Sequence, residues 1–589
     1  MNKNLITKKS AHSLLALAMA GSLAFTTGCE RPDWENPDYI ARMLEEGDDR
    51  QRREAVGTLR TFPEDRRGEI ASSLTAIYLE DRELRDTVMQ HLIQWRLPGA
   101  TAAYVEEMKT DQTGNAEFAG EALGLIDSRD SIPAMLEAFE STGSDSRRDG
   151  ILRGLAKMPD PRVVDVALEV LALDVDNHRI TMHSNTCDMV GELALEHPDA
   201  INEELQLALI RSVFLSDEVG RMVTNECRLA IQKVGRPITP LLVQLFNQEN
   251  EDVQRLLMTY EQSTDQYQYP FNRAKHEATV LLTAIRAPEA VALFIADLQA
   301  EKEVDQSYSQ ARRQSWLRQE GAALNEMIHA LGDLGDPSAR GVLERIIAGE
   351  LAESTWRGLI DDRGDFQFRQ DGAAALARLG DRQARGALLR AAQADVIPIM
   401  ARRFAAVASQ SPENAVPEDE QFRPQWRAAE AFAYLAEAED RARFVTYMEG
   451  LSEGPYRKKV ASFLPAFEVA DACGALESDT EKASCYQGFL THESEAGPRK
   501  AIYELSRLPA EAAGPVIAEA ISIGDLGLRE LVTFAGYRVP SEELATRIDT
   551  VLAAEASRSA QEYRVDRRRL QMLQAFIRSQ GSAVAVAEE

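Results

Sequence analysis

Residues 371–383 read DGAAALARLGDRQ, and this stretch decides the fold. Alanine and leucine recur in it at the spacing of one helix face, and the pattern then meets Gly380 and Asp381. Glycine ends a helix in the left-handed conformation, and aspartate caps the helix that follows. The stretch therefore predicts two helices joined by a tight turn, which together form a helical hairpin.

The same turn recurs elsewhere in the chain. LGDPS at 334–338 and MPDPR at 158–162 each follow an apolar helical pattern and open another one. Proline fits the first turn of a helix without losing a hydrogen bond. Looser copies recur along the chain at a spacing of roughly 40 residues. No alternating pattern predicts a strand, so we expect an all-α protein in which each hairpin buries its apolar stripe against its neighbours.

The turns and the helices before them, at 320–337 and 371–381, resemble HEAT repeats. The resemblance implies a right-handed α-solenoid of about thirteen stacked helical hairpins, which we place at residues 37–578. The tetratricopeptide alternative needs a steadier period and a Trp-Leu-Gly-Tyr pattern, neither of which the sequence contains.

The first 28 residues predict a secretory signal peptide. A basic start with Lys3, Lys8 and Lys9 precedes an apolar run at 14–25, as export signals require. The run is too short to cross the ~30 Å hydrocarbon core of a bilayer comfortably. We therefore expect residues 1–28 to be removed rather than to span a membrane.

The end of this run, TTGC at 26–29, resembles the lipobox of bacterial lipoproteins. The resemblance implies cleavage before Cys29, a lipid on that cysteine, and a short linker over 29–36. A residue other than Asp after the lipid-bearing cysteine, here Glu30, favours the periplasmic face of the outer membrane. The alternative is an ordinary signal peptide with a chance cysteine.

The charge balance restricts the choice of partner. The chain has 589 residues, with 66 Lys+Arg against 95 Asp+Glu and a formal net charge of -29. Nucleic-acid binding needs a surplus of cations, so we expect no nucleic-acid partner. An anionic membrane surface would repel the protein, and membrane contact is expected through the lipid alone. The small, acidic tail at 579–589 is predicted to be disordered.

Four of the five cysteines fall into two pairs. Cys473 and Cys485 lie on either side of a turn near Ser478, and equal distances from a hairpin turn predict a disulfide between them. Cys187 and Cys227 hold equivalent positions in repeats 40 residues apart. Stacked helices lie ~8–10 Å apart, beyond the ~7 Å Cα separation that a disulfide allows. We therefore expect these two to be buried thiols.

Four connections between hairpins are longer than usual, near 250–272, 303–319, 353–369 and 409–427. All four follow the second helix of a hairpin, so they should line one edge of the stack. Aromatic and arginine side chains anchor protein interfaces, and the edge is our candidate partner-binding platform. An equal alternative is that the aromatic residues pack the insertions onto the solenoid. They are Tyr260, Tyr267, Tyr269, Phe271, Tyr308, Trp316, Trp356, Phe366, Phe368, Phe422 and Trp426.

Metal-ligating residues are sparse and scattered. His276-Glu277 looks like the His-Glu motif of deoxyhypusine hydroxylase, but that family needs four such pairs, and the second pair here, His492-Glu493, lies far away. His178, His183 and Cys187 could share one transition-metal site. Phosphate-loop and nucleophile-elbow motifs are missing from the sequence. We therefore predict no metal, no cofactor and no catalytic residue.

These observations favour a non-enzymatic, lipid-anchored scaffold of the bacterial envelope. Its partner would be another envelope protein or a peptide, bound along an extended solenoid surface. The alternative is a metal-dependent enzyme or hydrolase built on HEAT-like repeats. The sequence leaves the oligomeric state open.

Overall fold

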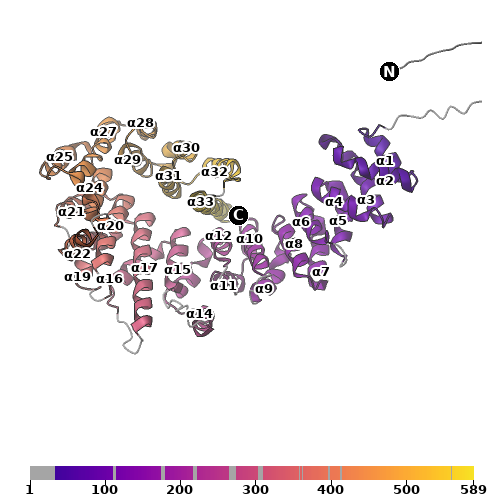
Figure 1. Ribbon diagram of the computed structural model, residues 1–589, viewed down its shortest axis with the longest axis horizontal. Helices are drawn as coiled ribbons and strands as arrows, with labels where there is room; N and C mark the ends of the chain where they lie inside the picture. The colour runs from indigo at the N-terminus through magenta and orange to yellow at the C-terminus, as the bar shows by residue number, and fades with distance from the viewer. Residues whose placement is uncertain are drawn as a thin grey trace, which may run out of the picture. The chain divides into compact units, whose positions relative to one another are not determined.

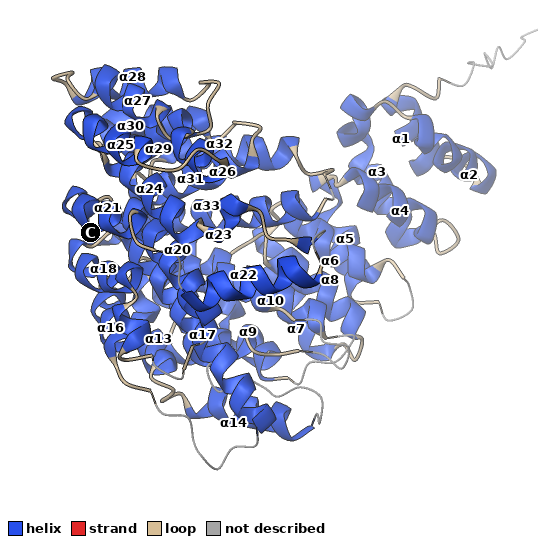
Figure 2. Cartoon of the chain, turned by 60° about the vertical axis from the view of Figure 1, so that its left-hand side comes forward, coloured by secondary structure: helices blue, strands red, loops and turns tan. Residues whose placement is uncertain are grey.

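The computed structural model describes residues 33–110, 114–173, 179–216, 222–263, 273–302, 310–356, 359–360, 362–395, 398–411, 414–558 and 560–588. Cys29 and the predicted signal peptide lie outside them. Within them the regular structure is helical, apart from an isolated bridge between Ser216 and Met222 (Figure 2). No helix of this described part has the length and apolar character needed to cross a bilayer.

The chain forms two compact units, Met1–Ala103 and Tyr104–Glu589. The first unit packs α1 against α2 and α3, and α3 against α4. Its first two helices begin at polar caps: the Asn36 side chain accepts a hydrogen bond from the Asp38 N–H at 3.0 Å, and the Asp48 side chain accepts one from the Gln51 N–H at 2.9 Å. The bounds are α1 Pro37–Glu45, α2 Asp49–Thr58, α3 Ala71–Glu80, α4 Arg85–Trp95 and α5 Thr101–Met108, which crosses the boundary between the units.

The second unit contains the remaining helices (Figure 1). They are α6 Ala116–Leu125, α7 Ile132–Ser141, α8 Asp145–Leu155, α9 Val164–Ala172, α10 Ile180–Glu196, α11 Glu203–Ser212, α12 Thr224–Val234, α13 Thr239–Phe246, α14 Glu251–Ser263, α15 Arg273–Ala284, α16 Glu289–Gln299, α17 Gln310–Leu334, α18 Arg340–Ala348, α19 Glu350–Glu353, α20 Asp362–Leu379, α21 Arg385–Ala392, α22 Pro398–Gln410, α23 Glu418–Gln421, α24 Arg423–Leu435, α25 Arg441–Glu449, α26 Pro455–Ala461, α27 Pro465–Cys473, α28 Asp479–Phe489, α29 Ala496–Leu505, α30 Ala510–Ala520, α31 Leu526–Arg538, α32 Glu542–Ala554 and α33 Gln561–Glu588.

The glycine-aspartate turns form as the sequence predicts. Gly335 and Gly380 end α17 and α20 with φ of 78° and 81°, in the left-handed region that favours glycine. Asp336 and Asp381 then accept hydrogen bonds from backbone N–H groups two residues on, at 2.8 and 2.9 Å. The prediction of an all-α solenoid built from helical hairpins is confirmed.

The hairpins of the second unit stack in two rows. In the row that we call the inner row, each helix packs on the next, in the order α6, α8, α10, α12, α15, α17, α20, α24, α29, α31 and α33. In the other row α9 packs on α11, and α16 and α21 both pack on α18. The core lies between the rows, where Leu331, Leu343 and Leu376 are completely buried.

The inner row closes on itself. Its last helix, α33, packs on α12 and α10, which lie more than 300 residues earlier in the chain (Figure 1). Beside this contact, Gln232 of α12 donates a hydrogen bond to the Tyr537 hydroxyl of α31 at 3.2 Å. The sequence did not predict these contacts between inner helices of distant repeats.

The predicted insertions are more helical than expected. The segment 250–272 contains α14, 303–319 contains the first residues of α17, 353–369 contains the start of α20, and 409–427 contains α23 and the start of α24. Within the predicted tail, α33 continues to Glu588, and Ser579 is 9% exposed. These segments, which the sequence predicted as long connections between hairpins, therefore contain regular helices of their own.

Glycine allows the closest helix packing in the second unit. Gly120 and Gly124 of α6 face Gly150 and Gly154 of α8, and backbone meets backbone between them. A Cβ atom on Gly150 would overlap the backbone carbonyl of Glu117. The pairing of α6 with α8 therefore depends on the missing side chains.

We expect Gly150→Ala to lower the free energy of unfolding by about 1–3 kcal/mol, because the added methyl group overpacks this contact. The matched control is Gly341→Ala on α18, where a Cβ meets no atom within 4 Å. That change should stabilise by up to about 1 kcal/mol through helix propensity. Urea unfolding followed by circular dichroism measures both, and equal stability of the two variants would contradict the close packing.

Candidate partner-binding groove

A groove of about 610 Å³ lies between α17 and α20. The two helices approach closely near their C-terminal ends, where a Cβ on Gly332 would lie 2.7 Å from the Cα of Ala375. Their N-terminal halves leave the groove between them. Its lining residues are Gln314, Leu317, Arg318, Gly321, Ala322, Asn325, Leu359, Ile360, Gly364, Gln367 and Phe368.

The groove brings two of the four predicted insertions together. Gln314, Leu317 and Arg318 come from the segment 303–319, and the lining residues from Leu359 to Phe368 come from 353–369. This supports the inference that insertions of consecutive repeats line one edge. Its lining combines aliphatic side chains with amides, and among the described lining residues Arg318 is the charged one.

Trp356 and Phe368 support the groove from inside instead of forming its outer surface. Trp356 is 1% exposed, and its indole Nε1 donates a hydrogen bond to the Leu298 carbonyl at 3.0 Å. Its ring meets the Phe368 ring edge-on at 5.3 Å, and its carbonyl accepts from the Leu359 N–H at 2.9 Å. Trp356 thus positions two lining residues, and its prediction as an exposed anchor is wrong.

Trp426 is also wrongly predicted as an exposed anchor. It is 4% exposed, donates to the Asp419 carbonyl at 3.1 Å, and lies between the cationic groups of Arg427 and Lys459. Phe422, which is half-buried, stacks on Tyr456 at 4.6 Å. These contacts are of the kind that the alternative describes, in which aromatic rings pack the inserted segments onto the stack.

The other predicted anchors divide into two groups. Trp316 and Phe366 are half-buried, and Phe366 packs edge-on against Phe404 of α22 at 5.9 Å. The rest fall outside the described side chains and stay predictions: Tyr260, Tyr267, Tyr269, Phe271 and Tyr308.

Sequence reasoning missed the side chains that could receive a partner. Asn325 lines the groove, and its buried side-chain carbonyl makes no hydrogen bond to the described protein atoms. Leu317 and Ile360 are half-buried and add apolar surface. One signal was present in the sequence: Gly321 interrupts a helical pattern, which often marks close approach of another group.

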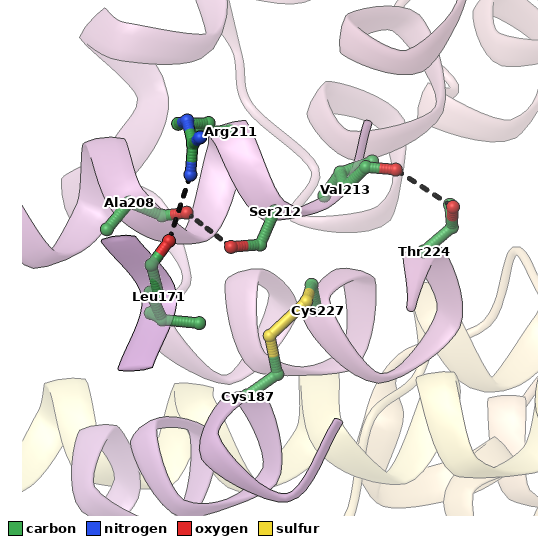
Figure 3. The surroundings of a disulfide bond; sticks show 8 residues. All are labelled: Leu171, Cys187, Ala208, Arg211, Ser212, Val213, Thr224 and Cys227. Atoms are coloured by element: carbon green, nitrogen blue, oxygen red, sulfur yellow. Dashed lines mark hydrogen bonds between the residues drawn. A yellow bond between two sulfur atoms is a disulfide. The ribbon is translucent and has the colours of Figure 1, made fainter. Parts of the chain in front are cut away.

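The disulfides match one prediction and overturn another. Cys473 and Cys485 are joined, as the hairpin geometry predicted. Cys187 and Cys227 are joined as well, with a Cα–Cα distance of 4.9 Å (Figure 3), so the expectation of two thiols is wrong. Gly191 explains the difference: a Cβ there would lie 3.1 Å from the Cα of Ala230, so α10 and α12 approach closely beside the cysteines.

The transition-metal site considered for His178, His183 and Cys187 is not assembled by the described residues. Cys187 is held in the disulfide, and His178 lies outside the described residues. The His183 ring is completely buried, and burial, together with Arg211 and Arg179, lowers its pKa to about 4. Within the described part of the chain, no group of three His, Cys, Asp or Glu side chains could hold a metal ion.

One member of each His-Glu pair makes an ordinary contact with other side chains. Glu277 pairs with Arg228 at 2.5 Å. His492 contacts the Ser494 hydroxyl at 2.8 Å and lies 3.8 Å from Glu468. Neither pair shows the clustering of ligands that a di-iron site requires.

No protein-family model matches the chain, and no curated protein matches it either. Solved structures show distant likeness. Importin beta is 11% identical with a TM-score of 0.39, over 92% of this chain and 77% of that one. Kap121p is 11% identical with a TM-score of 0.26, over 93% and 68%. An engineered protein is 15% identical with a TM-score of 0.24, over 75% and 99%. At such scores the likenesses say nothing about what this chain binds.

We expect the Cys187–Cys227 disulfide to contribute about 4 kcal/mol to the free energy of unfolding, and Cys473–Cys485 about 3 kcal/mol, because the first closes the longer loop. Replacing each pair by alanine and measuring urea unfolding tests the order. Peptide mapping after unfolding without reductant should recover Cys187 linked to Cys227. Alkylation of either residue in that sample would contradict the bond.

Proposed function

We propose that the protein is a non-enzymatic scaffold that receives a peptide segment of a partner protein in the groove between α17 and α20. One observation carries the proposal: the stack brings two inserted segments of consecutive repeats together around this groove. Interfaces concentrate their energy in a pocket with an apolar floor and a few oriented polar groups. The groove has both, with Phe368 at its floor and the Asn325 amide in its wall.

The chemistry of the groove favours an apolar segment with an exposed backbone. Leu317, Leu359 and Ile360 would contact aliphatic or aromatic side chains of the partner. The Asn325 carbonyl would accept a hydrogen bond from a backbone N–H, which replaces the partner that this buried atom lacks. Arg318, which is exposed at the groove, would favour an acidic residue at one end of the segment.

The location of the scaffold is a further part of the proposal. The lipobox-like sequence before Cys29 supports a lipid anchor, and Glu30 supports the periplasmic face of the outer membrane. A lipid anchor raises the local concentration of the scaffold at the membrane, so an interface of modest affinity would be occupied there. The partner would then be another protein of the bacterial envelope.

Gly321→Tyr should block the groove without disturbing the fold, because a Cβ on Gly321 meets no atom within 4 Å. Gly341→Tyr is the matched control, since Gly341 lies on α18 with the same open surroundings. A photo-crosslinking amino acid at Gln314, which is exposed in the groove, should capture a partner in intact cells. The same probe at the exposed Gln393 should not.

The expected result is an adduct at least tenfold weaker in Gly321→Tyr than in Gly341→Tyr, identified by mass spectrometry. An adduct of equal strength in both variants would show that the partner binds elsewhere. Circular dichroism checks that both variants keep their helical content.

Cys29→Ser should move the protein from the membrane fraction to the soluble fraction, because the lipid would lose its attachment site. Cell fractionation with immunoblotting measures this, and a metabolic label with a fatty-acid analogue should be lost in parallel. Unchanged membrane partitioning of the variant would reject the anchor and leave the groove proposal intact.

A further inference from the structure

A second pocket, of about 320 Å³, lies where α17, α20, α24, α29 and α31 of the inner row converge. Polar and charged side chains dominate its lining, which is separate from the groove except for Gln367. Within a chain of net charge -29, its arginines outnumber its acids. The arginines are Arg378, Arg423, Arg427 and Arg499, and the acids are Asp371, Glu430 and Glu530.

Two of the acids are already committed to arginine partners. Glu430 accepts from Arg427 at 2.6 Å and from the Tyr434 hydroxyl at 3.2 Å. Glu530 pairs with Arg569 at 3.0 Å and with Arg378 at 3.5 Å. Their charges are therefore neutralised by neighbours and repel an incoming anion only weakly.

Asp371, the third acid of the lining, is mostly buried and lies beside an amide and an imidazole ring. It accepts from Gln367 at 2.8 Å and lies 3.6 Å from the His329 ring nitrogen. Burial raises the pKa of Asp371, while His329 and Arg427 act in the opposite direction. The Asp371 carboxylate therefore has Gln367 and His329 as its nearest polar neighbours in the pocket.

Arg423 and Arg499 keep donors for a ligand. Arg423 pairs with Glu420 at 3.3 Å and Arg499 with Glu495 at 2.9 Å, and neither carboxylate lines the pocket. Glu495 is exposed and Glu420 is half-buried, so water screens both ion pairs and each contributes little to stability. The Nε–H groups of both arginines are buried and make no hydrogen bond to the described protein atoms.

We propose that this pocket binds a small organic anion through Arg423 and Arg499. A guanidinium group presents a planar fork of N–H donors that matches the oxygens of a carboxylate or a phosphate. The pocket volume is near the lower end of the range for small-molecule sites, which selects a compact ligand over a protein segment. Tyr434, Tyr503 and Gln370 add hydroxyl and amide groups that suit a ligand with further polar atoms. This site is independent of the scaffold function proposed for the groove.

Isothermal titration of the full chain at low salt tests the pocket, with citrate as the carboxylate probe and inorganic phosphate as the phosphate probe. We expect saturable binding of at least one probe with a Kd below about 1 mM. The combined variant Arg423→Gln with Arg499→Gln should weaken that binding at least tenfold. The control is Arg255→Gln with Arg547→Gln, which removes the same charge from exposed positions and should bind as the native chain does.

A charge-preserving variant distinguishes directed hydrogen bonding by the guanidinium group from nonspecific electrostatic attraction of the anion. Arg423→Lys keeps the cation and removes the Nε donor and the fork, so it should also weaken binding severalfold. Absence of saturable binding of both probes would overturn the proposal, and so would equal binding by the native chain and by Arg423→Lys. If the double glutamine variant fails to fold by circular dichroism, the lysine variant decides the question. Loss of the partner adduct in Gly321→Tyr would leave this result unaffected.

Discussion

Arginine side chains of one repeat cap the helix ends of another, and the closed inner row depends on this interaction. Arg286, in the turn after α15, donates to the carbonyls of Asp333 and Leu334 at 3.0 and 2.9 Å. Arg538, at the end of α31, donates to the Gly332 carbonyl at 3.0 Å. The last carbonyls of a helix have no partner within it and carry the negative end of its dipole. The end of α17 is thereby tied both to the previous repeat and to one some 200 residues later.

This arrangement lowers the stability of the charged side chains involved, because it places several arginine cations close together inside the protein. Burial lowers the pKa of Arg538 to about 10, and the nearby Arg286 adds to the effect. Asp333 offsets the cost, since it pairs with Arg378 at 3.0 Å and attracts both other arginines. Gly335 has a second role here: the Arg538 guanidinium occupies the place where a Cβ would lie. The same glycine therefore turns the chain and admits the arginine that closes the row.

The repeat, its turns and the hairpin disulfide could be predicted from the sequence, because each depends on residues close together in the chain. Gly380 and Asp381 show their roles through their neighbours alone. The contact of α33 with α12 could not be predicted, since no periodic pattern relates segments so far apart. The sequence predicted that the insertions lie along one edge of the stack, but it did not predict the groove between α17 and α20. Trp356 was chosen because aromatic residues favour interfaces, but the same apolar surface favours burial, and the sequence does not say which of the two prevails.

The distribution of charge explains how an acidic chain can build local sites for anions. Lysine is rare in this sequence, and arginine supplies most of its cations. Arg378, Arg423 and Arg499 line the inner pocket, whereas Glu420 and Glu495, which pair with two of them, lie in more exposed positions. A guanidinium group is more weakly hydrated than an ammonium group and makes several directed hydrogen bonds, so it tolerates burial better. Net charge describes the long-range field of the whole protein, whereas the side chains that line a pocket set the local potential there, so an acidic chain can still contain a pocket in which arginines outnumber acids.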